Sequence, residues 1–171
     1  MNIEKKYALG LIITVAAIFL AKYLSEQNTV MVGDKAMNFT YTNMEGREEQ
    51  LLDQSASYTL LDFWASWCQP CRLGNKKLVN IYKNSQPNDL KIISIGIEKD
   101  SLEWETAIEE DSLPWDDQYS SFTMFNDRIV DGYKVTTTPT YFLIDKDENI
   151  IAKSHDLEDI KSVLVKKDII H

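Results

Sequence analysis

The stretch from Leu60 to Cys71 constrains this chain more than any other, and it reads L-L-D-F-W-A-S-W-C-Q-P-C. Its apolar first half has the length of a buried strand. Pro70 is typical of the first turn of a helix, where the N–H that proline lacks would have no partner in any case. The stretch therefore predicts a strand that leads directly into a helix, with Cys68 at the junction.

Cys68 and Cys71 are the only cysteines in the chain, and their spacing is that of a redox dithiol. At the start of a helix, the free N–H groups and the positive end of the helix dipole favour the thiolate form of Cys68. The thiolate is the nucleophile in disulfide exchange. Cys71 lies one turn further along, where we expect it to be more buried and to resolve the mixed disulfide.

Two other interpretations of the cysteine pair are weaker. A zinc site needs four ligands, and the only histidines, His155 and His171, are far away in the sequence. A structural disulfide stabilises most when it closes a long loop, whereas this pair closes a very short one. Redox chemistry is the stronger interpretation. It requires no metal and no cofactor, because the dithiol itself carries two electrons.

Residues 7–21 form an uncharged, mostly aliphatic run behind Lys5 and Lys6. The run is short for a membrane span, but the next three residues, Lys-Tyr-Leu, extend it if the lysine reaches to the interface. A signal-peptide core is the alternative, yet a cut after Ala21 would put Phe19 at a position that prefers small residues. The sequence therefore predicts an uncleaved anchor over residues 1–25.

The basic residues before this run predict the topology of the chain. Lysines ahead of an anchor keep the N-terminus inside, so we expect a single pass through the cytoplasmic (inner) membrane of a bacterium. Residues 26–30 read as a linker, and residues 31–171 have the length of one domain, which would lie in the periplasm or outside the cell. The net charge of −9 argues against nucleic acid as a partner, because phosphate contacts need clustered basic residues.

The rest of the chain alternates between strand and helix patterns. An N-terminal hairpin turns at Glu45-Gly46, and a loop rich in aromatic residues is expected over 113–125. The other expected elements are hairpin strands at 38–42 and 49–52, strands at 58–64, 90–97, 141–145 and 149–153, and helices at about 70–83, 101–110, 126–133 and 157–166. Leu73, Leu78, Ile81 and Tyr82 are the expected packing residues of the first of these helices.

This order of elements is that of a thioredoxin fold, an α/β fold in which a central mixed sheet is flanked by helices. The segments F-W-A-S-W-C-Q-P-C-R at 63–72 and V-T-T-T-P-T-Y-F-L-I-D at 135–145 agree with it. The stretch V-G-D-K-A at 32–36, Phe39, the helix around Trp104 and the N-terminal anchor are more specific. Together they resemble the membrane-tethered TlpA/ResA-type thiol–disulfide oxidoreductases.

The resemblance implies a substrate-binding edge beside the cysteines. Pro139 would be a cis-proline that faces them and, with Thr138, exposes backbone groups to pair with a substrate strand. From the sequence alone an ordinary trans proline is the more common outcome. Trp67 would be a surface aromatic of the same groove, alongside Gln69 and Pro70. Trp64, by contrast, is expected in the core.

Asp62 is an acid inside a predicted buried strand, which is costly unless the acid has partners or a task. The resemblance implies that it stands at the place of the buried aspartate of thioredoxin and accepts a proton from the second cysteine. Burial would raise the pKa of Asp62 toward neutrality and suit it to this exchange. The alternative is an acid at the strand edge that points at water.

The chain departs from the resemblance just after the cysteines. The family usually reads Arg-x-Glu-x-Pro there, whereas this chain has Gly74 in place of the acid and Lys76 in place of the proline. Gly74 also weakens the helix by about 1 kcal/mol relative to alanine. Asp62 or Glu98 would then handle the proton, although Glu98 fits equally well as a solvated acid at a strand end.

The resemblance implies an oxidoreductase that exchanges electrons with protein disulfides, apocytochrome c among them, and receives them from a membrane or extracytoplasmic dithiol donor. Gln69 and Pro70 add no positive charge to stabilise a thiolate strongly, which favours a reductant. A peroxidase of the peroxiredoxin type is an alternative, but its P-x-x-x-T-x-x-C pattern does not fit the residues before Cys68. A binding module that uses the groove without turnover is another alternative.

Overall fold

The computed structural model describes residues 3–26, 29–53, 55–86 and 88–170. The chain divides into two compact units, Met1–Val30 and Met31–His171. The first unit contains helix α1 (Ile3–Glu26), on which large apolar side chains such as Leu11 and Phe19 are exposed. Among the described residues, no helix has both the length and the apolar character that crossing a membrane requires. The predicted anchor and linker lie partly outside the described residues, at residues 1–2 and 27–28.

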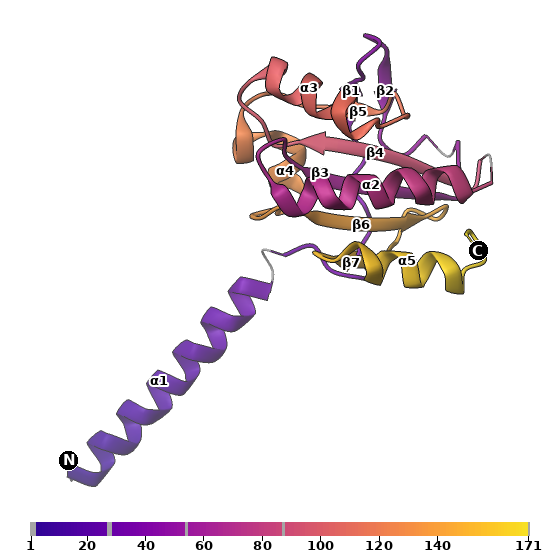
Figure 1. The fold of residues 1–171 in the computed structure, drawn as a ribbon. Coiled ribbons are helices and arrows are strands. Elements are labelled where there is room, and N and C mark those ends of the chain that lie inside the picture. Colours follow the sequence, from indigo (N-terminus) through magenta and orange to yellow (C-terminus); the bar gives the residue numbers. More distant parts are fainter. Residues whose placement is uncertain (1–2, 27–28, 54, 87, 171) are drawn as a thin grey trace. The chain divides into compact units, whose positions relative to one another are not determined.

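The second unit is built on a five-stranded sheet with the strand order β5-β4-β3-β6-β7 (Figure 1). The central strand pairs parallel with β4 and antiparallel with β6, so the sheet is mixed, as predicted. The strands are β3 (Tyr58–Trp64), β4 (Leu90–Gly96), β5 (Gln118–Tyr119), β6 (Thr140–Asp145) and β7 (Ile150–Ser154).

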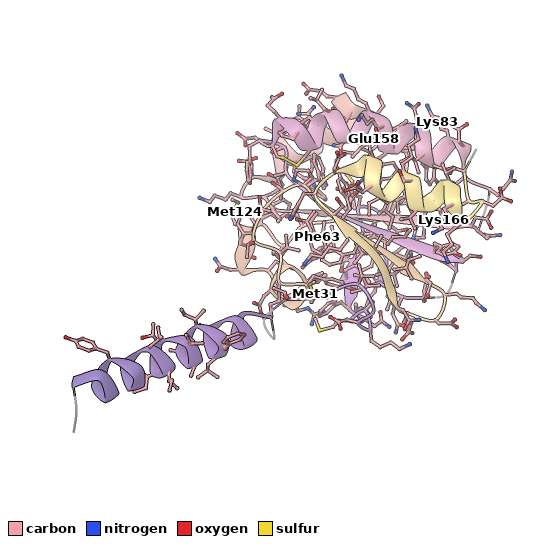
Figure 2. All side chains as sticks on the ribbon, turned by 90° about the horizontal axis from the view of Figure 1, so that it is seen from below. Met31, Phe63, Lys83, Met124, Glu158 and Lys166 are labelled. Carbon is pink, nitrogen blue, oxygen red and sulfur yellow. A yellow bond between two sulfur atoms is a disulfide. The ribbon has the colours of Figure 1, made fainter. Side chains whose placement is uncertain are left out.

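Helices cover both faces of this sheet, and a different set of core residues packs on each face. On one face, α2 (Gln69–Asn84) and α5 (Leu157–Lys166) lie side by side (Figure 2), and their apolar residues share a cluster with Leu60. On the other face, Tyr133 follows α4 (Arg128–Gly132), and its ring lies 5.7 Å from that of Phe63. The remaining helices are α3 (Ser101–Asp111) and the short 3-10 helix η1 (Met124–Asn126).

The N-terminal part of the second unit pairs with the edge of the sheet. The predicted hairpin forms from β1 (Thr40–Thr42) and β2 (Glu48–Gln50) as a separate two-stranded sheet. Just before it, the Gly33 N–H donates to the Ile150 carbonyl at 2.8 Å, and the Ile150 N–H donates to the Asp34 carbonyl at 2.9 Å. These bonds cover the start of the edge strand β7, whose backbone groups would otherwise be open to pairing with another chain.

The structure confirms most of the predicted elements and corrects two points. Strand 58–64 and helix 157–166 have the predicted bounds. The predicted loop 113–125 contains β5, which is too short to show a periodic pattern and exists because it pairs with β4. Leu73 was expected to pack, but it is 64% exposed, because it lies off the helix face that buries Cys71, Leu78 and Ile81.

Candidate functional site

Cys68 and Cys71 lie at the start of α2 and form a disulfide, the bond between two sulfur atoms in Figure 2. Cys68 is the N-cap residue of the helix, and its Sγ accepts a hydrogen bond from the Cys71 N–H at 3.3 Å. Cys68 is 6% exposed, whereas Cys71 is fully buried. The predicted strand-to-helix junction is confirmed, and one N–H group of the helix N-terminus donates to the first sulfur.

The turn that leads into α2 explains why the helix begins there. The Cys68 N–H donates to the Ala65 carbonyl at 3.1 Å, which closes the turn after β3. Pro70 stands in the first turn of the helix, as its fixed φ favours. Gln69 and Pro70 are both exposed, so the chain between the two cysteines faces solvent.

Glu98 follows β4 and lies beside this turn. Its carboxylate accepts hydrogen bonds from both the N–H and the hydroxyl of Ser66, the latter at 2.9 Å. Glu98 is 1% exposed, so its interpretation as a solvated acid is wrong. Burial raises the pKa of its carboxyl group, and the charge of Glu103 raises it further, while the bonds from Ser66 act in the opposite direction.

Trp67 is the exposed aromatic of the site, as predicted, with 51% of its surface accessible. Its indole N–H donates to the Ile97 carbonyl at 3.1 Å, which holds the ring in one orientation. A hollow of about 320 Å³ lies against it and is lined by Trp67, Glu98, Lys99, Glu103 and Met124. The residue next to Cys68 therefore forms one wall of a hollow with both apolar and charged lining.

Asp62 is fully buried in the middle of β3, which excludes an acid that points at water. It lies directly between Ser94 of β4 and Tyr141 of β6 in the sheet register. The Ser94 hydroxyl donates to Asp62 Oδ2 at 3.1 Å. Burial raises the pKa of Asp62 to about 7, and the bond from Ser94 lowers it only in part. The predicted shift toward neutrality is confirmed.

The Thr138–Pro139 peptide bond is cis, as the resemblance implies. Thr140, the next residue, pairs with Phe63 near the carboxyl end of β3, the end from which the chain continues to Cys68. The cis bond therefore lies at the same end of the sheet as the cysteines. Thr138 and Pro139 are both partly exposed, and the Pro139 carbonyl oxygen lies 2.9 Å from His155 Nδ1.

Gly74, where the family usually has an acid, has a steric role in this chain. A Cβ at this position would lie 2.6 Å from the hydroxyl oxygen of Tyr141. The tyrosine is buried on β6 and reaches up to the backbone of α2 one turn after Cys71. A side chain at position 74, an acid included, would therefore collide with the Tyr141 hydroxyl unless the tyrosine or the helix moved.

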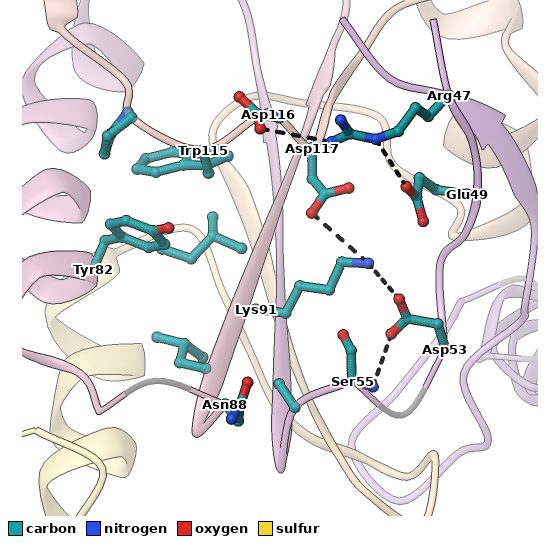
Figure 3. Close-up of a pocket in the computed structure, with 14 residues that line it drawn as sticks. Arg47, Glu49, Asp53, Ser55, Tyr82, Asn88, Lys91, Trp115, Asp116 and Asp117 are labelled. Atoms are coloured by element: carbon teal, nitrogen blue, oxygen red, sulfur yellow. Dashed lines mark hydrogen bonds and ion pairs between the residues drawn. The ribbon is translucent and has the colours of Figure 1, made fainter. Parts of the chain in front are cut away.

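A second, larger hollow lies away from the cysteines (Figure 3). It has a volume of about 380 Å³, and its lining contains none of the predicted site residues. Lys91 lies between two acids there, 2.9 Å from Asp53 and 3.7 Å from Asp117. The charged side chains that line this hollow pair with one another. We therefore interpret their ion pairs as a structural contact between the segment after β2 and strand β4.

Several residues of the site were not found from the sequence. Ser66 and Ser94 donate hydrogen bonds to Glu98 and Asp62, but single serines in a turn and in a strand carry no local signal. His155 contacts the cis-proline turn across a gap of 16 positions in the sequence. Tyr141 stands inside the quoted 135–145 segment, yet only the tertiary structure reveals its contact with Gly74.

Residues 32–153 match the AhpC/TSA family. The chain belongs to that family. Among curated proteins, the thiol-disulfide oxidoreductase ResA of Geobacillus thermodenitrificans is 29% identical over 147 residues, which cover 84% of this chain and 82% of the relative. The likeness to ResA-type proteins seen in the sequence is thereby confirmed.

Solved structures agree with this relationship. The thioredoxin domain of a thiol-disulfide oxidoreductase from Bacteroides vulgatus is 25% identical, with a TM-score of 0.72 over 82% of this chain and 99% of that one. A thiol-disulfide oxidoreductase from Bacteroides fragilis is 29% identical, with a TM-score of 0.70 over 78% and 98% of the two chains. This AhpC/TSA member has a thioredoxin-like fold, and with its Cys68–Cys71 disulfide it is a thiol–disulfide oxidoreductase.

Proposed function

We propose that the chain reduces disulfides of substrate proteins outside the cytoplasm and that Cys68 is the attacking residue. The Cys68 thiolate attacks one sulfur of the substrate disulfide, which breaks that bond and releases a substrate thiolate. Cys71 then loses its proton and attacks Cys68, and the second substrate thiolate leaves. Two electrons pass to the substrate, and a dithiol donor must reduce Cys68–Cys71 again.

The observation that carries this assignment is the position of the two sulfurs on α2. Cys68 caps the helix and accepts an N–H bond at its sulfur, which stabilises a thiolate there. Cys71 is fully buried, so a substrate protein cannot reach it first. Cys71 can, however, reach Cys68, because the two residues already form a disulfide.

We assign Asp62 the role of exchanging a proton with the thiol of Cys71. Its pKa of about 7 leaves it partly ionised near neutral pH, so it can take a proton from a thiol and return it. The Asp62 face of β3 is the face that α2 covers, because Leu60 and Trp64 on the same side belong to the cluster that includes Cys71. Glu98, bound to Ser66, is the second candidate for this exchange.

The groups around Cys68 would bind the substrate. The backbone of Thr138, held in place by the cis bond to Pro139, would pair with an extended substrate segment, as a strand adds to a sheet edge. Trp67 and the hollow beside it would receive a side chain of that segment, and the exposed Gln69 and Pro70 would lie against it. Apocytochrome c whose cysteine pair has been oxidised to a disulfide is one protein that can be tested as a substrate.

Trapping experiments test the roles of the cysteines. In the Cys71→Ser variant, the mixed disulfide has no resolving thiol, so complexes with substrate proteins should accumulate on Cys68. The matched Cys68→Ser variant should trap far less, because Cys71 is buried. Equal trapping by both variants would overturn the assignment. The reduction potential of the pair, measured against glutathione, tests the direction, since a strongly oxidising value would contradict a reductase.

The membrane anchor is part of the same proposal, and its support is the sequence. Residues 7–21 are uncharged and follow Lys5 and Lys6. A reporter enzyme that is active only in the periplasm, fused after Gln27, should give signal. A stronger signal from a reporter that works only in the cytoplasm would contradict the topology. Release of the full chain from membranes by carbonate would contradict the anchor itself.

A peroxidase remains the second candidate, because the chain belongs to the AhpC/TSA family. A peroxidase reduces hydrogen peroxide at a cysteine and needs no protein disulfide as substrate. Consumption of peroxide by the reduced chain, compared with reduction of insulin disulfides under the same conditions, separates the two. We expect the insulin reaction to be the faster one and to depend on Cys68.

A further inference from the structure

His155 lies against the cis-proline turn. Its Nδ1 is 2.9 Å from the carbonyl oxygen of Pro139 and 3.1 Å from the hydroxyl oxygen of Thr140. The Thr140 hydroxyl is in turn 2.7 Å from the Thr137 carbonyl oxygen. One imidazole nitrogen therefore contacts both the residue that forms the cis bond and the residue after it.

The protonation of Nδ1 follows from counting donors and acceptors. The Pro139 carbonyl oxygen can only accept, so the contact at 2.9 Å requires a proton on Nδ1. Thr140 donates its hydroxyl proton to the Thr137 carbonyl, so toward His155 its oxygen can also only accept. An Nδ1–H that is shared between the two oxygens satisfies every contact. The neutral Nδ1–H tautomer and the imidazolium both provide it.

The backbone that carries His155 is itself held in place. His155 stands between the end of β7 and α5, whose N-cap residue is Asp156. The Ser154 hydroxyl oxygen accepts the Asp156 N–H at 3.0 Å and donates to Asp159 at 2.6 Å. The segment is therefore fixed on both sides of His155, and the ring connects the start of α5 to the cis-proline turn.

We propose that His155 is a positioning residue for substrate docking: its Nδ1–H holds the Pro139 carbonyl and so fixes the backbone that pairs with a substrate strand. This inference rests on the proposed function, in which Thr138 and Pro139 form the docking edge. A turn that is already held in the binding conformation loses less entropy when substrate binds. The effect should appear in the KM for polypeptide disulfides more than in kcat, because His155 does not touch the reacting sulfurs.

Nitrogen NMR of the full chain in mild detergent tests the tautomer directly. The chain has two histidines, so the spectrum of a His155→Asn variant identifies the signals of His155 by their loss. In the neutral form we expect the proton on Nδ1 of His155, whereas free histidine favours Nε2. A proton on Nε2 would overturn the inference whatever the enzyme does, so this measurement is independent of the proposed function.

Steady-state kinetics with insulin as the disulfide substrate and dithiothreitol as reductant test the role. The side-chain amide N–H₂ of asparagine can take the place of Nδ1–H, whereas glutamine places its amide one carbon further out. In His155→Ala and His155→Gln we expect the KM for insulin to rise about threefold to tenfold, the size of one lost hydrogen bond. In His155→Asn the KM should stay within about twofold of the wild type.

The outcomes separate the two proposals. A wild-type KM in His155→Ala, or an Asn variant impaired as much as the Gln variant, would overturn the role of His155. If His155→Ala does not fold, the comparison of the two amides still decides the question. Wild-type protein without Cys68-dependent insulin reduction would instead contradict the proposed function and leave the tautomer result standing.

Discussion

Asp62 and Ser94 face each other across β3 and β4, and the Ser94 hydroxyl donates a hydrogen bond to Asp62 Oδ2 at 3.1 Å. The oxygen of Ser94 in turn lies 3.1 Å from the indole nitrogen of Trp115, which donates to it. Trp115 therefore orients Ser94, and Ser94 holds one oxygen of the acid. Within the described part of the chain, the other oxygen, Oδ1, has no hydrogen-bond partner. It is the atom on which a proton can be carried.

Replacing Asp62 with asparagine should slow the step in which Cys71 gives up its proton. The side chain keeps its shape, but the exchange is lost, and we expect a fall of ~10²-fold in that step. For the wild type we expect the rate of insulin reduction, measured between about pH 6 and pH 9, to show an inflection near pH 7, and the variant should lack it. An unchanged profile would leave Asp62 as a structural residue.

The same variant should change how stability depends on pH. Burial raises the pKa of Asp62 to about 7 from its usual 3.8, so the native state keeps a proton that the unfolded chain has lost. The contribution of Asp62 to the free energy of unfolding is greatest below about pH 4. It falls by up to roughly 4 kcal/mol as the pH rises through about 7. The stability of Asp62→Asn relative to the wild type should therefore rise over this range.

Urea unfolding at a series of pH values measures this difference. Glu105→Gln is a matched control, because it also removes one acid, but from an exposed position on α3. Its stability relative to the wild type gives the baseline, and the difference for Asp62→Asn should vary with pH more than this baseline does. If the Asp62 variant gives an equally flat difference, the buried acid does not titrate as its burial predicts.

Glu98→Gln should separate a structural role from proton exchange. Glutamine keeps an oxygen that can accept the Ser66 N–H, but it cannot take up a proton. If Asp62 handles the proton, this variant should keep the pH profile of insulin reduction and lose at most about tenfold in rate, the size of one lost hydrogen bond. A loss as large as that of Asp62→Asn, with a changed profile, would identify Glu98 as the proton acceptor.

Gly74 and Tyr141 should show a strong energetic coupling. Gly74→Ala places a methyl group 2.6 Å from the Tyr141 hydroxyl oxygen, so the single variant should be destabilised. Tyr141→Phe removes that oxygen, and in this background alanine should be tolerated and should gain up to about 1 kcal/mol of helix propensity. Urea unfolding of the two single variants and the double variant gives the coupling, which we expect to be about 1–3 kcal/mol. Additive effects would contradict the contact.

Lys91→Met tests whether the charged hollow is structural. Asp53 and Asp117 would lose their shared cation, and we expect a loss of about 1–3 kcal/mol in unfolding free energy at neutral pH. Burial alone would raise the pKa of Asp53, but bonds from Ser55 and Lys91 outweigh it and hold the pKa below 3.8. The stability from this acid is therefore lost as the pH falls, and the difference between variant and wild type should shrink below about pH 4. Insulin reduction should be unchanged, because Lys91 pairs with Asp53 and Asp117, which are not among the groups assigned to the reaction.

Local patterns were sufficient for the elements that present the cysteines. The apolar run from Leu60, with Pro70 after it, predicted β3 and the start of α2, and the helix start placed Cys68 beside free N–H groups. Each of these signals depends on neighbours in the chain, so the sequence carries it directly. The cis bond before Pro139 followed only from the resemblance, because most X–Pro bonds are trans.

Contacts between distant residues were decided by the tertiary structure alone. Glu98 accepts hydrogen bonds from Ser66, 32 positions away, and the pKa of Asp62 depends on the helix and strands that exclude water from it. By its helix propensity alone, Gly74 weakens α2, but the tertiary structure places the Tyr141 hydroxyl where a side chain at position 74 would begin. His155 had no motif around it and gained a partner only when β7 was placed beside β6. The free energy of such contacts comes from groups that the fold brings together, and no local pattern of residues records it.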